Sequence, residues 1–89
     1  MKVVLLYRPN SEFARSSEEF VNEFERRTSK TIETINIDTP EGISKAQLYG
    51  VMDHPTFVAL SDDGGFLRAW TGKPLPVMND LSAYAGNRR

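Results

Sequence analysis

Hydrophobic positions change their spacing several times along the chain, and the first changes predict a strand followed by a helix. Residues 3–7 form a continuous apolar run of β-favouring side chains, which is typical of a strand covered on both faces. Apolar side chains then recur at helical spacing, and Asn10 or Ser11 is expected to cap this helix with a side-chain oxygen. A capping-box pattern beginning at Ser16 offers a later start, but only the earlier start keeps Phe13 in phase with the other apolar positions. The expected core positions are Phe13, Ala14, Phe20, Val21 and Phe24.

A second strand and a second helix follow. Residues 31–38 alternate loosely and are rich in Ile and Thr, which predicts a strand. Asp38 or Thr39 is expected to cap a helix whose first residue is Pro40, and Gly50 marks its end. Because a strand, a helix and a strand succeed one another here, the two strands are predicted to be parallel, with a right-handed crossover. The core-facing positions expected on the second helix are Ile43, Ala46 and either Gln47 or Leu48.

The last third of the chain predicts a hairpin and a short helix. Residues 56–60 and 66–70 are two short β-favouring runs, and the Asp- and Gly-rich residues 61–65 between them indicate a hairpin turn. Pro76 is expected to open a final helix, and residues 86–89 are expected to fray. The element order is therefore β-α-β-α-β-β-α in a single domain, residues 1–89. The apolar positions of the final helix are Val77, Leu81 and Tyr84.

Composition excludes several classes of function. Eleven basic and twelve acidic residues give a formal net charge of −1, which provides no electrostatic reason to bind nucleic acid or an anionic membrane. The chain has no cysteine and one histidine, so no disulfide, catalytic thiol, metal site or other cofactor is expected. Its apolar opening is too short for a signal peptide, and no stretch approaches the roughly 20 apolar residues of a membrane span. The prediction is a cytoplasmic protein, taken as a monomer by default.

The stretch Tyr49-Gly-Val-Met-Asp-His-Pro55-Thr, together with the element order, resembles the thioredoxin superfamily over essentially the whole chain. The resemblance implies a central four-stranded mixed sheet flanked by helices and a cis peptide bond before Pro55. It also implies a glycine after the fourth strand, and Gly72 matches that position. The short N-terminal region is similar to that of glutaredoxin-sized members, whose motif is Pro-x-Cys-x-x-Cys. Ser11 and Ala14 stand at the two cysteine positions of that motif.

These departures exclude the family's chemistry. Thiol–disulfide exchange needs a thiolate and a second sulfur, and this chain has neither. Leu5 also takes the place of the buried carboxylate that thioredoxins carry in an early strand. A replacement of two original cysteines by Ser11 and Ala14 is a further interpretation, which the absence of cysteine elsewhere disfavours.

The leading hypothesis is a redox-inactive domain that binds a protein or an extended peptide. In thioredoxin-like proteins, the backbone beside the cis proline binds peptides by strand-like hydrogen bonding; the alternative is that Pro55 only sets a turn. Trp70, if exposed beside Tyr7, Phe13 and Met52, would add an apolar patch. The candidate binding region comprises Pro9, Asn10, Ser11, Phe13, Ala14, Met52, His54 and Pro55.

An enzyme that reuses the fold is the alternative from another class. Ser11 would need an activating base within hydrogen-bond reach, and His54 is the only histidine. Binding of a glutathione-like ligand at Ser11 and His54 is a related alternative. The simpler interpretation makes Ser11 a helix cap and His54 a loop residue.

Three further patterns are weaker. The first turn of the expected first helix could bind an anion, but Glu12 places a negative charge there. Residues 62–65 lack the alternating ligands of a calcium loop. Arg26, Arg27 and Lys30 form a small basic patch with glutamates interleaved, which argues against nucleic-acid binding.

Overall fold

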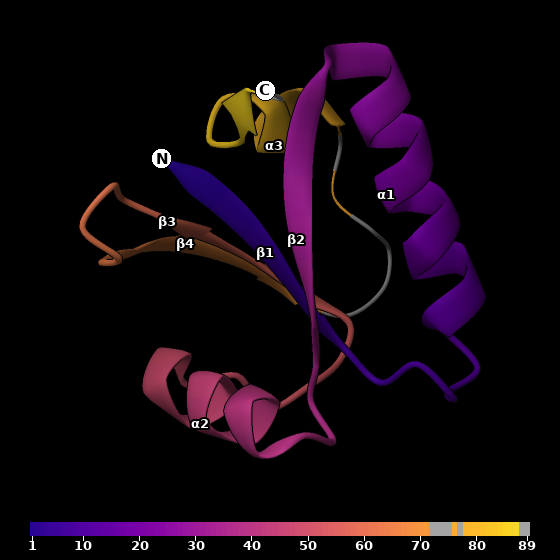
Figure 1. The fold of residues 1–89 in the computed structure, drawn as a ribbon, viewed down its shortest axis with the longest axis vertical. Helices are drawn as coiled ribbons and strands as arrows, with labels where there is room; N and C mark the ends of the chain where they lie inside the picture. Colours follow the sequence, from indigo (N-terminus) through magenta and orange to yellow (C-terminus); the bar gives the residue numbers. More distant parts are fainter. Residues whose placement is uncertain (72–75, 77, 88–89) are drawn as a thin grey trace.

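The fold is built on a mixed sheet (Figure 1), in which all of the central strand β3 and residues 3–6 of the central strand β1 are buried. The computed structural model describes residues 1–71, 76 and 78–87. β1 pairs in parallel with β2 and antiparallel with β3, and β3 pairs antiparallel with β4. This arrangement confirms the predicted four-stranded mixed sheet, the parallel crossover and the closing hairpin. In spatial order these four strands are β4 (Phe66–Thr71), β3 (Thr56–Leu60), β1 (Lys2–Tyr7) and β2 (Lys30–Asn36), and a short fifth strand, β5 (Gly86–Asn87), lies beyond β2.

Helices cover both faces of this sheet, which explains the continuous apolar runs in the central strands. α1 (Ala14–Thr28) and α3 (Met78–Ser82) pack on the face that includes Val3 and Leu5. α2 (Pro40–Tyr49) packs on the opposite face, which includes Val4 and Leu6. Alternate residues of β1 therefore enter two separate core clusters, as the strand period of two requires.

α1 begins later than the sequence predicts. Residues 9–13 form turns, and the helix starts at Ala14 with Phe13 as its N-cap, which makes no side-chain cap hydrogen bond. Ser11 does not cap the helix, because its hydroxyl donates to the Arg8 carbonyl oxygen at 2.8 Å. The expected core face is otherwise present: Ala14, Val21 and Phe24 are buried, and Phe20 packs against the same cluster.

α2 has the predicted ends. Thr39 is its N-cap, and the Thr39 hydroxyl oxygen accepts from the Gly42 N–H at 3.0 Å. Pro40 occupies the first helical position, where a missing N–H costs nothing. Gly50 closes the helix in the left-handed conformation, with φ of 68°, which glycine adopts without steric strain.

The C-terminal part of the chain differs from the prediction in two respects. α3 starts at Met78 rather than at Pro76, while Val77 and Gly72 lie outside the described residues. Gly86–Asn87 form a short strand, β5, which pairs antiparallel with the first residues of β2. The expectation of fraying is therefore wrong for these two residues, because they supply hydrogen-bond partners to an otherwise open strand edge.

Candidate functional site

Three loops among the described residues lie at the same end of the sheet, and this convergence defines the candidate site (Figure 1). Tyr7, the last residue of β1, lies opposite Asn36, the last residue of β2, because these strands are parallel. Leu6 lies opposite Thr56, the first residue of β3, because β1 and β3 are antiparallel. The loops 8–13, 37–39 and 50–55 therefore meet beyond this edge, which we call the loop end.

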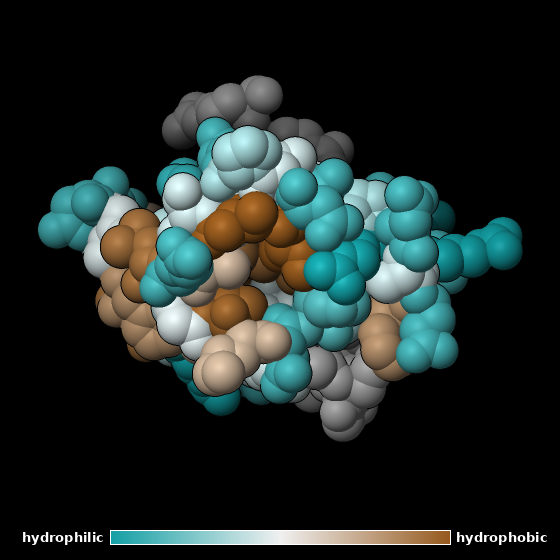
Figure 2. All heavy atoms as spheres, turned by 90° about the horizontal axis from the view of Figure 1, so that it is seen from below, coloured by the Kyte–Doolittle hydropathy of each residue, from teal (hydrophilic) through white to brown (hydrophobic). Residues whose placement is uncertain are grey.

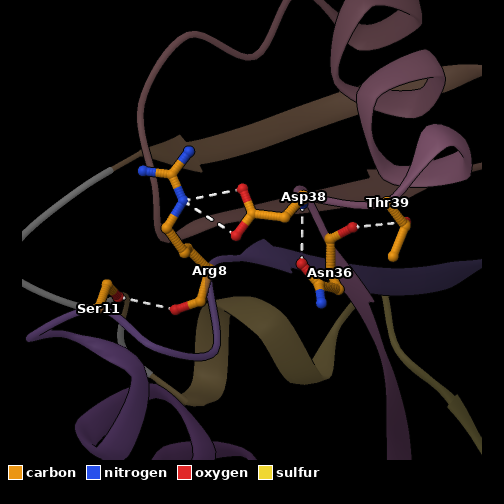
Figure 3. A network of polar contacts seen from close by, with 5 residues as sticks. All are labelled: Arg8, Ser11, Asn36, Asp38 and Thr39. Carbon is orange, nitrogen blue, oxygen red and sulfur yellow. Dashed lines mark hydrogen bonds and ion pairs between the residues drawn. The ribbon is translucent and has the colours of Figure 1, made fainter.

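An ion pair joins two of these loops (Figure 3). The Arg8 Nε–H donates to both carboxylate oxygens of Asp38, at 3.0 and 3.2 Å. The Asp38 backbone N–H donates to the Asn36 side-chain oxygen at 2.8 Å, and the Thr39 hydroxyl donates to the Asn36 carbonyl oxygen at 2.8 Å. Because both charged side chains are about half exposed, the pair contributes at most about 1 kcal/mol, and its main effect is to orient the loops.

Sequence analysis did not identify this network, since Arg8 and Asp38 are 30 residues apart. A signal did exist in the predicted topology: both residues directly follow parallel neighbouring strands, whose carboxyl ends share one edge of the sheet.

The eight predicted binding residues lie on two of the converging loops and the first residue of α1. Their side chains differ in exposure, so they differ in what they can offer a ligand. Asn10 and Met52 are exposed; Pro9, Ser11, Phe13 and His54 are partly buried; Ala14 and Pro55 are buried.

Ser11 and His54 are not joined by a hydrogen bond. The Ser11 hydroxyl donates to the Arg8 carbonyl, and the buried His54 Nδ1 has no hydrogen-bond partner among the described residues. A serine nucleophile requires a base positioned to remove its proton. This arrangement therefore does not activate Ser11.

The segment that leads into β3 is fixed at its inner end and exposed at its outer end. The His54–Pro55 peptide bond is cis, and Pro55 is fully buried. The Thr56 hydroxyl donates to the Asp53 carbonyl oxygen at 2.7 Å. Met52, by contrast, is 94% exposed.

The expected patch of Trp70, Tyr7, Phe13 and Met52 does not form, because two of its members pack inward. The Trp70 and Tyr84 rings are in edge-to-face contact at 5.6 Å, and both pack against the α1 face of the core. Tyr7 packs on the same cluster and donates its hydroxyl proton to Glu18 at 2.8 Å. Partial burial and the neighbouring Glu18 carboxylate raise the pKa of Tyr7.

The exposed apolar side chains at the loop end come instead from α2 and from the loop that follows it. Ile43, which was expected to face the core, is 48% exposed, and Leu48, expected there as an alternative to Gln47, is 71% exposed. Ala46 and Tyr49 cover the sheet in their place. We call Ile43, Leu48 and Met52 together the Met52 surface. Figure 2 views this end of the molecule and shows hydrophobic residues gathered near its middle, bordered by hydrophilic ones.

Other classes of site find little support among residues 1–71, 76 and 78–87. No group of three or more histidine, aspartate or glutamate side chains is placed to hold a metal ion there. No helix in this part of the chain is both long and apolar enough to cross a membrane.

In the small basic patch, Arg26 and Arg27 both pair with Glu23. The hydrogen bond from Arg27 is the largest cause that lowers the pKa of Glu23.

Comparison with known proteins identifies the fold but not the function. No protein-family model and no curated protein matches the sequence. Among solved structures, thioredoxin 1 from the thermophilic eubacterium Thermosipho africanus TCF52B superposes with a TM-score of 0.68 over 94% of this chain and 89% of that protein. Sequence identity between the two is 13%. The chain therefore has a thioredoxin-like fold, and it has no cysteine with which to carry out thiol chemistry.

Proposed function

We propose that this thioredoxin-like domain binds a protein segment or an extended peptide at its loop end, without thiol–disulfide chemistry. The fold and the absence of cysteine are consistent with a redox-inactive domain. A fold alone does not specify a function, so the proposal depends on the residues at this end of the sheet.

The observation that carries the proposal is the exposure of Met52. A methionine that is 94% exposed gains nothing from folding, because its apolar surface stays in water. It lies three residues before the fully buried Pro55, so its backbone is anchored nearby. A flexible, polarisable side chain presented in this way is suited to contact with varied apolar partners.

The backbone of this loop adds hydrogen-bonding capacity. Within the part of the chain that the structure describes, the N–H groups of Met52, Asp53 and His54 donate to no protein acceptor. Backbone polar groups need a partner, and an extended peptide laid beside the loop can provide acceptors in the manner of an added strand. Apolar contact and backbone pairing together support recognition of an extended segment.

A displayed library of random peptides, selected on the immobilised intact protein, tests the proposal. Peptides are expected to be enriched, and Met52→Gln is expected to weaken their binding by at least about tenfold, because buried apolar contact is lost. Phe66→Gln is the matched control: Phe66 is 52% exposed and lies at the opposite end of β3. Failure to enrich peptides, or equal losses for both variants, would contradict the proposal.

The alternatives at Ser11 and His54, catalysis or a glutathione-like ligand, are not favoured, because the Ser11 hydroxyl donates to the Arg8 carbonyl and the buried His54 Nδ1 has no hydrogen-bond partner among the described residues. A cytoplasmic location remains a prediction from the sequence.

A further inference from the structure

We infer that the segment bound at the loop end is basic as well as apolar, with lysine or arginine side chains between its hydrophobic ones. This inference rests on the proposed function and specifies its partner. The Met52 surface provides the apolar contacts, and carboxylates at the same end of the molecule provide the charge.

Three carboxylates at this end of the molecule are not paired with any other residue that the structure describes. Glu12 lies on the loop after β1, Glu41 in the first turn of α2, and Asp53 on the loop before Pro55. None of the three side-chain carboxylates takes part in a hydrogen bond or an ion pair with another described residue, and Asp53 accepts only through its backbone carbonyl. Apart from these, only Asp80 on α3 shares this property among the described acidic residues.

The nearby cations are already paired. Arg8 binds Asp38, and Arg15 binds Glu19 at 3.6 Å, so neither guanidinium neutralises the three free carboxylates. Lys45, partly buried on α2, is the one described cation of this end that makes no ion pair. Counted over the described residues, the loop end therefore carries an excess of uncompensated negative charge.

This charge distribution is complementary to a cationic ligand. In an extended segment, alternate side chains point in opposite directions, so apolar residues can contact the Met52 surface while basic residues face the rim. Charge complementarity of this kind accelerates association and discriminates against acidic partners. It also makes binding sensitive to salt, since the rim carboxylates are exposed to solvent.

Sequencing the peptides selected on the intact protein, followed by affinity measurements on one enriched synthetic peptide, tests the inference. Lysine and arginine are expected to be over-represented, and binding is expected to weaken with added sodium chloride. The triple variant Glu12→Gln, Glu41→Gln, Asp53→Asn is expected to lose about tenfold in affinity, the combined effect of three exposed ion pairs.

Asp80→Asn is the matched control, because Asp80 is also unpaired but lies on α3, away from the loops (Figure 1). The thermal unfolding of every variant is recorded, so that a loss of binding is not mistaken for a loss of folding. Peptides without a basic excess, bound equally well by the triple variant, would overturn the inference and leave the proposed function standing. Failure to select any peptide would overturn both.

Discussion

Replacing Gly42 with alanine is expected to destabilise the protein, although alanine is the better helix former. Gly42 is buried in the first turn of α2. A β-carbon at this position would lie 2.7 Å from the Asn36 carbonyl carbon and 2.8 Å from the Ile37 Cα, with the Asn36 oxygen closer still. All three are backbone atoms, so no side-chain rotation relieves the clash and α2 itself must move away from β2.

The cost can be divided into three contributions. Overpacking of a tight contact costs about 1–3 kcal/mol. The Asn36 carbonyl also accepts from the Thr39 backbone N–H at 3.2 Å and from its hydroxyl at 2.8 Å, and loss of the cap costs about 1 kcal/mol. Alanine in place of glycine returns about 1 kcal/mol of helix propensity. We therefore expect a net loss of about 2 kcal/mol, which lowers the melting temperature by roughly 10 °C for a domain of this size.

Urea unfolding followed by circular dichroism measures this difference, and the midpoint should fall without a change in slope. Ser44→Ala is the control, because Ser44 is exposed two residues further along the same helix. That variant should be as stable as the original protein or more stable by a few tenths of a kcal/mol. A Gly42→Ala protein that matched Ser44→Ala in stability would refute the close approach of α2 to β2.

Three further predictions concern separate parts of the molecule. Thr39→Ala should cost about 1 kcal/mol in urea unfolding because α2 loses its cap, and Thr39→Ser should restore most of it; equal losses would show that the hydroxyl is not the cause. Burial and Glu18 raise the pKa of Tyr7 above 10.0, so the folded state holds this proton more tightly than the unfolded state. The contribution of Tyr7 to the free energy of unfolding should therefore be fully present below about pH 10 and should be lost as the pH rises through the folded pKa. Tyr7→Phe should remove this pH dependence. The double variant Ser11→Cys, Ala14→Cys should lose both free thiols on oxidation, because the Ala14 N–H donates to the Ser11 carbonyl at 3.2 Å in a tight turn; two persistent thiols would contradict that turn.

Elements whose ends depend on local chemistry could be predicted from the sequence, and α2 is the clearest example. Thr39, Pro40 and Gly50 each impose a backbone preference within a few residues, and all three act as expected. The start of α1 could not be predicted in the same way. Ser11 has the chemistry of a cap, but its hydroxyl bonds the Arg8 carbonyl in the preceding turn, and residue preferences do not decide between competing acceptors of this kind.

The location of the candidate site could be predicted from the sequence, but the apolar side chains exposed there could not. Converging loops follow from strand order alone, and the sequence identified Met52 and Pro55 within them. It placed Ile43, and Leu48 as an alternative to Gln47, toward the core, because apolar residues on a helix usually face inward. α2 instead approaches the backbone of residues 36 and 37 closely at Gly42. Ala46 and Tyr49 cover the sheet, and Ile43 and Leu48 remain exposed. Such a close backbone approach leaves little trace in a hydrophobic pattern.

The exposure of Met52 also gives this cysteine-free chain a sulfur atom that oxidants can reach. A thioether takes up one oxygen atom from hydrogen peroxide to form a sulfoxide and water, which turns an apolar side chain into a polar one. At 94% exposure the reaction needs no opening of the fold, whereas Met78 packs against the core. Oxygen transfer to a methionine, rather than electron transfer through a disulfide, is thus the sulfur chemistry that remains open to this thioredoxin-like domain.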